Sequence, residues 1–154
     1  MSTPDFQNIF FDSFNTFKVF DDLSVIIANE KPPGAPKSVW QILNHLVSWQ
    51  QQQLSLLNGE TPLQNIIETE TWIGKPVNEQ SFIDSIVSTF NDQIKEIKHI
   101  TSALTPNTPS LQLKLKCVQD LTGHLSFHLG EIILIRRQLK NYPMPDEMKA
   151  FLLV

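Results

Sequence analysis

Two histidines four residues apart are the feature of this sequence with the clearest chemical meaning. His124 and His128 lie in the apolar run LTGHLSFHLGEIILIRR, residues 121–137. At about 100° per residue, a helix places them one turn apart on one face, where two imidazoles can share one metal ion. Helices that bind nothing also carry this spacing, so a metal site and an ordinary helix face are both open. His45 is the candidate third ligand.

A well-delimited helix is predicted to carry His45. Ser38 followed by Gln41 resembles a capping box, and Asn58-Gly59 is typical of a helix end, so a helix is expected over residues 39–57. Its apolar residues fall on two faces, which indicates packing on both sides and an inward His45. The alternative for such a histidine is a core side chain hydrogen-bonded to a carbonyl or carboxylate.

Three neutral imidazoles around one ion leave a coordination position open, which is the layout of a catalytic rather than a structural site. Zinc or nickel suits imidazole ligands. Asp120 precedes His124 by one turn and Glu131 follows His128 by one turn. Each carboxylate is a candidate to hold an imidazole through its other ring nitrogen, and Glu131 is also the candidate general base. The alternative for both is a solvated or salt-bridged side chain.

The rest of the chain supplies further helices and the breaks between them. Apolar spacing with start and stop signals predicts helices over residues 6–28, 39–57, 61–70, 78–104 and 112–140. Asn78 is expected to cap the helix that follows it, and Phe82 to begin its apolar face. Four long helices predict an all-α bundle that forms a single domain over residues 1–154. The connection between the second and third long helices is long. The apolar end, residues 151–154, is expected to dock on the bundle or on a second subunit.

Two tryptophans are candidates for the wall of a pocket. Trp49 lies on the same side of its predicted helix as His45, and Trp72 stands in the irregular connection 71–76. Long connections between helices are often lids or pocket walls. The alternative for Trp72 is a plug at the end of the core. His99 falls on the polar side of its helix, so we expect it to face solvent.

Composition narrows the function classes. The chain has 154 residues, of which 41% are hydrophobic and 18% charged, and its formal net charge is -4, which gives no footprint for nucleic-acid binding. The N-terminus does not read as a secretion signal and no run approaches the roughly 20 apolar residues of a membrane span, so a cytoplasmic protein is expected. Cys117 is the only cysteine, which excludes an internal disulfide and predicts a small buried hydrophobe.

Two segments carry a resemblance to a known family. WQILNHLVSWQ (residues 40–50) followed by GHLSFHLGEIILIRRQL (residues 123–139) resembles the DinB-like superfamily, the DinB/YfiT-like metalloenzymes. The phase of the three histidines, the Gly-Glu after the last one and the Arg-Arg-Gln beyond it all match. The resemblance implies an antiparallel four-helix bundle, often a homodimer, in which His45, His124 and His128 bind a divalent ion, commonly nickel or zinc.

The resemblance implies less about the reaction. Some relatives are S-transferases that use low-molecular-weight thiols such as bacillithiol or mycothiol, and others look like amide hydrolases or isomerases. Where the family often has Gly-Gln, this chain has Gly130-Glu131, which adds a carboxylate. The first hypothesis is therefore a metal-dependent enzyme that activates a thiol or water against a small-molecule substrate. The second is a non-catalytic metal-binding or stress-response interaction bundle. The carboxylates of a thiol would need a basic pocket, for which Arg136, Arg137 and Lys75 are the candidates.

Overall fold

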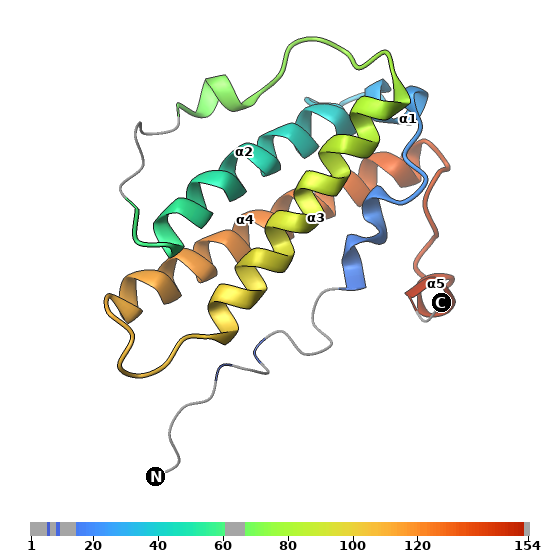
Figure 1. The fold of residues 1–154 in the computed structure, drawn as a ribbon. Helices are drawn as coiled ribbons and strands as arrows, with labels where there is room; N and C mark the ends of the chain where they lie inside the picture. Colours follow the sequence, from blue (N-terminus) through green and yellow to red (C-terminus); the bar gives the residue numbers. More distant parts are fainter. Residues whose placement is uncertain (1–5, 7–8, 10–14, 61–66, 153–154) are drawn as a thin grey trace.

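Every regular element of the described residues is helical. The computed structural model describes residues 6, 9, 15–60 and 67–152. The elements in chain order are η1 (Asn15–Phe20), α1 (Val25–Asn29), α2 (Val39–Leu57), η2 (Glu68–Thr71), α3 (Gln80–Ser102), α4 (Leu111–Gln138) and α5 (Met148–Leu152), where η denotes a 3₁₀ helix. The all-α class is as predicted, and three long helices, α2, α3 and α4, form the body of the molecule (Figure 1).

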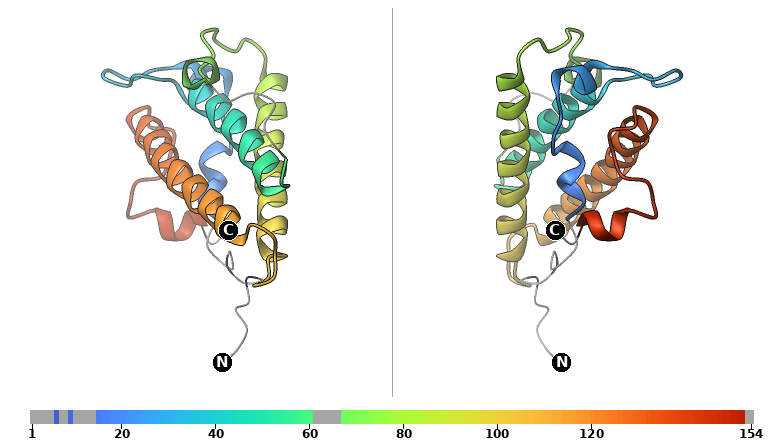
Figure 2. Two further views of the ribbon diagram at one scale, coloured as in Figure 1. Left: turned by 90° about the vertical axis from the view of Figure 1, so that its left-hand side faces the viewer. Right: turned by 90° about the vertical axis from the view of Figure 1, so that its right-hand side faces the viewer.

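The directions of the long helices differ from the expected antiparallel four-helix bundle. Lys114 Nζ donates to the Leu57 carbonyl, and Cys117 Sγ lies 3.7 Å from the Gln53 carbonyl oxygen. Lys114 lies beside Leu57, and Cys117, three residues later on α4, lies beside Gln53, four residues earlier on α2. These two helices are therefore antiparallel neighbours. Figures 1 and 2 show α3 running in the same direction as α2, so the end of α2 and the start of α3 lie at opposite ends of the molecule.

The first predicted helix is not continuous where the structure describes it. Asp22 has φ 53°, in the left-handed region that stops a helix. Ser24 then starts α1 afresh, its hydroxyl accepting from the Ile27 backbone N–H at 3.3 Å. The prediction of one helix over residues 6–28 is therefore wrong between Asn15 and Asn29, and most of its earlier part lies outside the described residues.

The second predicted helix has the predicted bounds, because both of its ends are specified locally. Ser38 and Gln41 form the reciprocal capping box, with hydrogen bonds of 3.0 and 3.3 Å. Asn58 is the C-cap, and Gly59 follows with φ 81°, a conformation that glycine adopts without strain. Of the short helix predicted over residues 61–70, residues 61–66 lie outside the described part, and η2 overlaps its described end.

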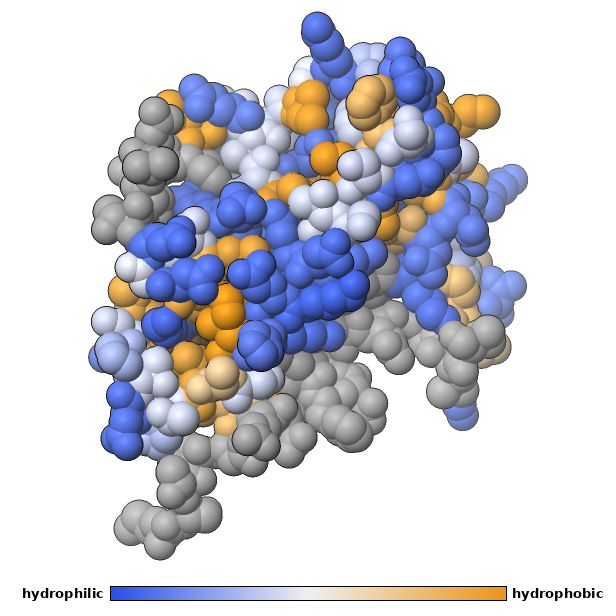
Figure 3. Space-filling model, in the orientation of Figure 1, coloured by the Kyte–Doolittle hydropathy of each residue, from blue (hydrophilic) through white to orange (hydrophobic). Residues whose placement is uncertain are grey.

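The start of α3 differs from the prediction by a small shift. Glu79 rather than Asn78 occupies the N-cap position, without a side-chain hydrogen bond. Phe82 is 53% exposed, whereas Ile83 is buried. Ile83 lies seven residues, about two helical turns, before the buried Phe90, so these two side chains share one face of the helix. The outer face of α3 is polar, and a hydrophilic band follows its course in Figure 3.

The end of α4 is fixed to the N-terminal segment and to the tail. Arg136 is buried, and its guanidinium donates to the Val19 carbonyl at 2.6 Å and to the Asp21 carbonyl at 3.0 Å. Lys18 Nζ donates to the Phe151 carbonyl at 2.8 Å, and the Phe151 ring lies 5.3 Å from that of Tyr142. The tail therefore docks on its own chain as far as it is described, and residues 153–154 lie outside that part.

Candidate metal centre

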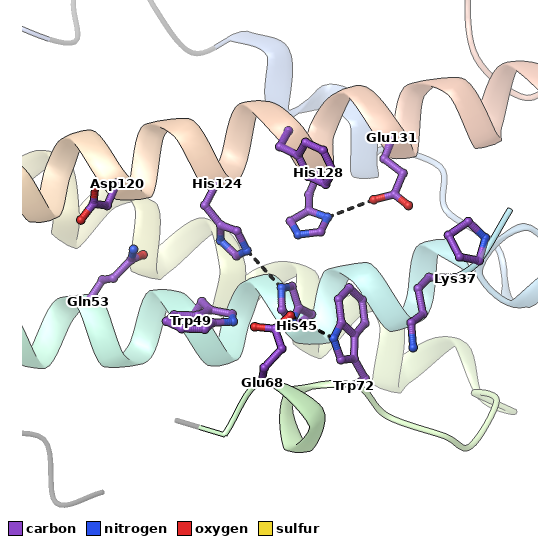
Figure 4. A pocket seen from close by; sticks show the side chains of 12 residues that line it. Lys37, His45, Trp49, Gln53, Glu68, Trp72, Asp120, His124, His128 and Glu131 are labelled. Atoms are coloured by element: carbon purple, nitrogen blue, oxygen red, sulfur yellow. Dashed lines mark hydrogen bonds and ion pairs between the residues drawn. The ribbon is translucent and has the colours of Figure 1, made fainter. Parts of the chain in front are cut away.

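Three histidines from two antiparallel helices converge on one point. α2 supplies His45, and α4 supplies His124 and His128 from successive turns. Their ligand atoms all lie within 4.8 Å of one another, and Nε2 of His45 is 3.0 Å from Nε2 of His124. His45 is 1% exposed and His128 is 6% exposed. Figure 4 shows the three rings facing one another in the space between α2 and α4.

Thr71 in η2 fixes the orientation of the His45 ring. His45 Nδ1 lies 2.6 Å from Thr71 Oγ1, and the Thr71 hydroxyl donates its single proton to the Glu68 carbonyl at 2.7 Å. Because a hydroxyl has one proton, Thr71 must accept from His45, and Nδ1 must carry the ring proton. The lone pair on Nε2 of His45 therefore points into the cluster.

Glu131 does the same for His128. Nδ1 of His128 donates to the Glu131 carboxylate, with 3.0 Å between Nδ1 and Oε2. Its Nε2 is then free to face the other two rings. Thr71 and Glu131 together leave two imidazoles in the tautomer that ligates through Nε2, which is how proteins commonly hold a histidine at a metal.

Burial keeps His45 and His124 neutral. The pKa of His45 is lowered to about 3, mainly because burial desolvates the ring and secondarily because His128 and His124 lie beside it. The pKa of His124 is lowered to about 4, again mainly by burial and then by His128. Neutral imidazole is the form that binds a metal ion, so both rings are ready to ligate at neutral pH without losing a proton to solvent.

The donor set fits a divalent ion with nitrogen preference. Two imidazole nitrogens bound at 2.0–2.1 Å in a tetrahedral site are about 3.3 Å apart, close to the 3.0 Å between the facing Nε2 atoms of His45 and His124. Without an ion, the Nε2–H of His124 has to donate to His45, and ligation moves that proton to the other ring nitrogen. The three histidines would supply three ligands and leave a fourth coordination position open.

The connection from η2 to α3 covers one side of the cluster. Trp72 stacks on His45, with ring centroids 3.8 Å apart and planes at 8°, and Lys37 Nζ lies 4.6 Å from the centroid of the Trp72 ring. Gln41 Nε2 donates to the Ile73 carbonyl at 2.9 Å, so the residue that caps α2 also fixes this connection. Trp72 therefore lies directly against the cluster, on the side of this connection.

A cavity of about 610 Å³ opens next to the histidines. The residues lining it are Pro36, Lys37, His45, Trp49, Gln53, Glu68, Trp72, Asp120, His124, Phe127, His128 and Glu131. Trp49 is one of the residues that border this cavity. Three carboxylates and one ammonium group line this space, so its lining is acidic overall.

Asp120 does not hold a histidine in the way that Glu131 does. Its carboxylate accepts from Lys116 Nζ at 2.6 Å, one turn away on α4. The prediction that Asp120 orients a ligand is replaced by the alternative, a salt-bridged carboxylate at the cavity mouth. Asp120 lies one turn before His124, and Lys116, one turn earlier on the same helix face, pairs with its carboxylate.

The predicted basic pocket is not assembled around the cluster. Arg136 is bound to backbone carbonyls of the N-terminal segment, Arg137 donates to the Pro143 carbonyl at 2.8 Å, and Lys75 is exposed in the connection before α3. His99 is exposed and Cys117 is buried, both as predicted.

Two contributors to the site were missed at the level of sequence. Thr71 and Gln53 both line or support it, yet neither belongs to a recognisable motif. Gln53 lies eight residues after His45 on α2, so the helical period offered a signal for it. Thr71 offered none, because the path of the connection decides where its hydroxyl lies.

The fold and the site together define an all-helical protein whose three histidines could hold a metal ion. The sequence model of the DinB superfamily matches residues 15–132, and the chain belongs to that superfamily. The match spans η1 to most of α4 and includes all three histidines. No curated protein and no solved structure matches the chain.

Among the helices of the described residues, none is both long and apolar enough to cross a bilayer.

Proposed function

We propose that this protein is a metal-dependent enzyme of the DinB superfamily in which His45, His124 and His128 hold one divalent ion, zinc or nickel. The observation that carries the proposal is the convergence of the three rings beside an open cavity, with His45 and His128 each fixed in the ligating tautomer. A structural zinc site is usually closed by four protein ligands, whereas three ligands leave room for substrate.

The bound ion would act as a Lewis acid that lowers the pKa of water or a thiol to near neutrality. Glu131 supports the reaction by accepting a proton at its carboxylate, which lies beside the cavity and already receives the Nδ1–H of His128. Trp72 and Trp49 form apolar walls that position the substrate and exclude bulk water.

The charges of the cavity do not choose between water and a thiol as the nucleophile. Glu68, Asp120 and Glu131 line it against Lys37, and Asp120 is itself paired with Lys116. The two positive charges of a bound divalent ion would offset the remaining carboxylates, so an anionic thiol would not be repelled. Hydrolysis and S-transfer from a thiol are therefore both proposed, and a screen of amide and thiol substrates on the metal-loaded protein separates them.

Metal analysis tests the proposal directly. Protein purified without chelator or histidine tag should contain about one zinc or nickel ion per chain, and His128→Ala should lose it. His99→Ala is the matched control, because His99 is exposed and outside the cluster. Native protein without metal after zinc or nickel is added back would overturn the proposal in favour of a non-catalytic bundle. Full metal content in the His128→Ala variant would overturn the assignment of ligands.

A homodimer is the proposed assembly. Support comes from the exposed apolar residues Phe127 and Leu134 on α4, 71% and 58% exposed, together with Gly130 between them, beside which an added Cβ would meet nothing within 4 Å. A glycine inside a helix costs about 1 kcal/mol against alanine, and close approach by a second copy would offset it. Sedimentation equilibrium of the native chain and of Leu134→Asp tests this, and a monomeric native protein would refute it.

A further inference from the structure

Glu68 is a cavity carboxylate that does not belong to α4. It lies in η2, on the connection that covers His45, and it lines the same cavity as the three histidines. Figure 4 shows its side chain directed from η2 toward the histidines, next to Trp72, whereas Glu131 comes from α4. Glu68 and Glu131 therefore approach the cluster from different elements.

The other two carboxylates of the cavity already have close partners. Asp120 is paired with Lys116 at 2.6 Å, and the Glu131 carboxylate accepts the Nδ1–H of His128 at 3.0 Å. Glu68 takes part in none of the ion pairs found among the described residues. Within that part of the chain, Glu68 is therefore the cavity carboxylate that remains available to a ligand.

Two hydrogen bonds fix Glu68 relative to His45. Its Oε1 accepts from the indole Nε1–H of Trp72 at 3.3 Å, and Trp72 is stacked on the His45 ring with centroids 3.8 Å apart. Its backbone carbonyl accepts from the Thr71 hydroxyl, which in turn accepts from Nδ1 of His45. The carboxylate is thus oriented before a ligand arrives, which lowers the entropy cost of using it. Its second oxygen, Oε2, has no hydrogen bond among the described residues.

Glu68 is close enough to act on the cluster electrostatically. The pKa of His124 is lowered mainly by burial and then by His128, and Glu68 acts in the opposite direction. Three imidazoles leave one coordination position of a tetrahedral ion for a ligand, and the cavity is the space from which a ligand enters. A ligand bound there therefore meets a carboxylate oxygen of Glu68.

We infer that Glu68 selects the ligand at the open position by accepting a hydrogen bond from the ligating atom. The inference rests on the proposed function, which places a divalent ion on the three histidines. Hydroxide on a metal keeps a proton on its oxygen, whereas a thiolate has no proton on its sulfur. A hydrogen bond to a carboxylate is stronger than one between neutral groups, so Glu68 favours water over a thiol as the nucleophile.

The test uses cobalt(II) in place of zinc or nickel, because its visible absorption changes when a ligand enters the coordination sphere. The full-length, cobalt-loaded chain is titrated with methanesulfonamide and with ethanethiol. Both bind a metal as monoanions after losing one proton, but only the sulfonamide nitrogen keeps a further proton for Glu68. The ratio of the two dissociation constants cancels any effect that a change of charge has on both anions.

Glu68→Gln should invert the hydrogen bond to the ligand. The N–H of Trp72 needs an acceptor, so the glutamine amide places its oxygen there and turns its NH₂ toward the ligand. The sulfonamide N–H then loses its acceptor and the thiolate gains a donor, so the ratio should move toward ethanethiol by about tenfold or more. Glu70→Gln is the matched control, because it makes the same charge change at an exposed position of η2. A ratio that Glu68→Gln leaves unmoved, or that Glu70→Gln moves equally, would overturn the inference.

Trp72→Phe tests whether the orientation of Glu68 matters. It keeps an aromatic ring to stack on His45 but removes the N–H that holds the carboxylate. In this background the glutamine amide is free to turn its oxygen toward the ligand, so Glu68→Gln should move the ratio by only about threefold or less. A shift as large as in the native background would show that charge acts rather than a fixed acceptor, and would overturn the inference.

Cobalt content separates this inference from the proposed function. A chain that takes up no cobalt, zinc or nickel would remove the metal-dependent function and the role of Glu68 with it. About one ion per chain, with a ratio that Glu68→Gln does not move, would keep the function and remove the role of Glu68. Loss of cobalt from the Glu68→Gln variant alone would also overturn the inference, because Glu68 would then bind the ion itself rather than its ligand.

Discussion

The hydrogen bond from His45 to Thr71 should set the metal affinity of the site, and Thr71→Val tests this. The substitution keeps the shape of the side chain but removes the oxygen that lies 2.6 Å from Nδ1 of His45. Because His45 is 1% exposed, water cannot readily replace that acceptor. Removal of such a supporting partner typically lowers metal affinity 10–100-fold, which corresponds to about 1.4–2.8 kcal/mol. Loss of this hydrogen bond should destabilise the metal-bound protein more than the metal-free protein. A bound cation makes the Nδ1–H of His45 more acidic and its hydrogen bond stronger.

A competition titration of zinc against a chelating dye measures the effect. Thr71→Ser is the control, because it keeps the hydroxyl that accepts from His45 and donates to the Glu68 carbonyl. Urea unfolding of the metal-free variants separates loss of affinity from loss of stability. If valine and serine at this position give the same dissociation constant, the stacking of Trp72 on His45 rather than the hydrogen bond holds the ring.

Three further outcomes are expected. Glu131→Gln should retain about one metal ion per chain yet slow turnover at least tenfold once a substrate is found, and unaltered turnover would remove the carboxylate from the reaction. Because burial lowers the pKa of His45 to about 3 and of His124 to about 4, the unfolded chain binds more protons than the folded one below about pH 6.5. The free energy of unfolding of the metal-free protein should therefore fall from pH 7.5 toward pH 4, and urea titrations of His45→Gln should show a weaker fall. Gln41→Glu keeps the acceptor for the capping box but cannot donate to the Ile73 carbonyl, so it should lower the free energy of unfolding by about 0.5–1.5 kcal/mol. A value equal to the native one would show that this contact does not hold the connection.

The bounds of α2 and the phase of the histidines on α4 are local properties, and the sequence by itself determined them. A capping box involves residues three apart, and His124 and His128 meet because one helical turn separates them. Membership of the DinB superfamily was also visible in two short segments, and it is confirmed over residues 15–132. The inward direction of His45 followed from the apolar residues around it on α2.

Contacts between distant segments were decided only by the tertiary structure. Thr71 reaches His45 because Gln41 and the packing of Trp72 fix the path of the connection, and no periodicity encodes that path. By contrast, the pairing of Asp120 with Lys116 is a local contact between residues four apart on α4, which their spacing already allowed. The relative register of two helices and the course of a long connection depend on how side chains from separate segments fill one core, which spacing along the chain does not specify.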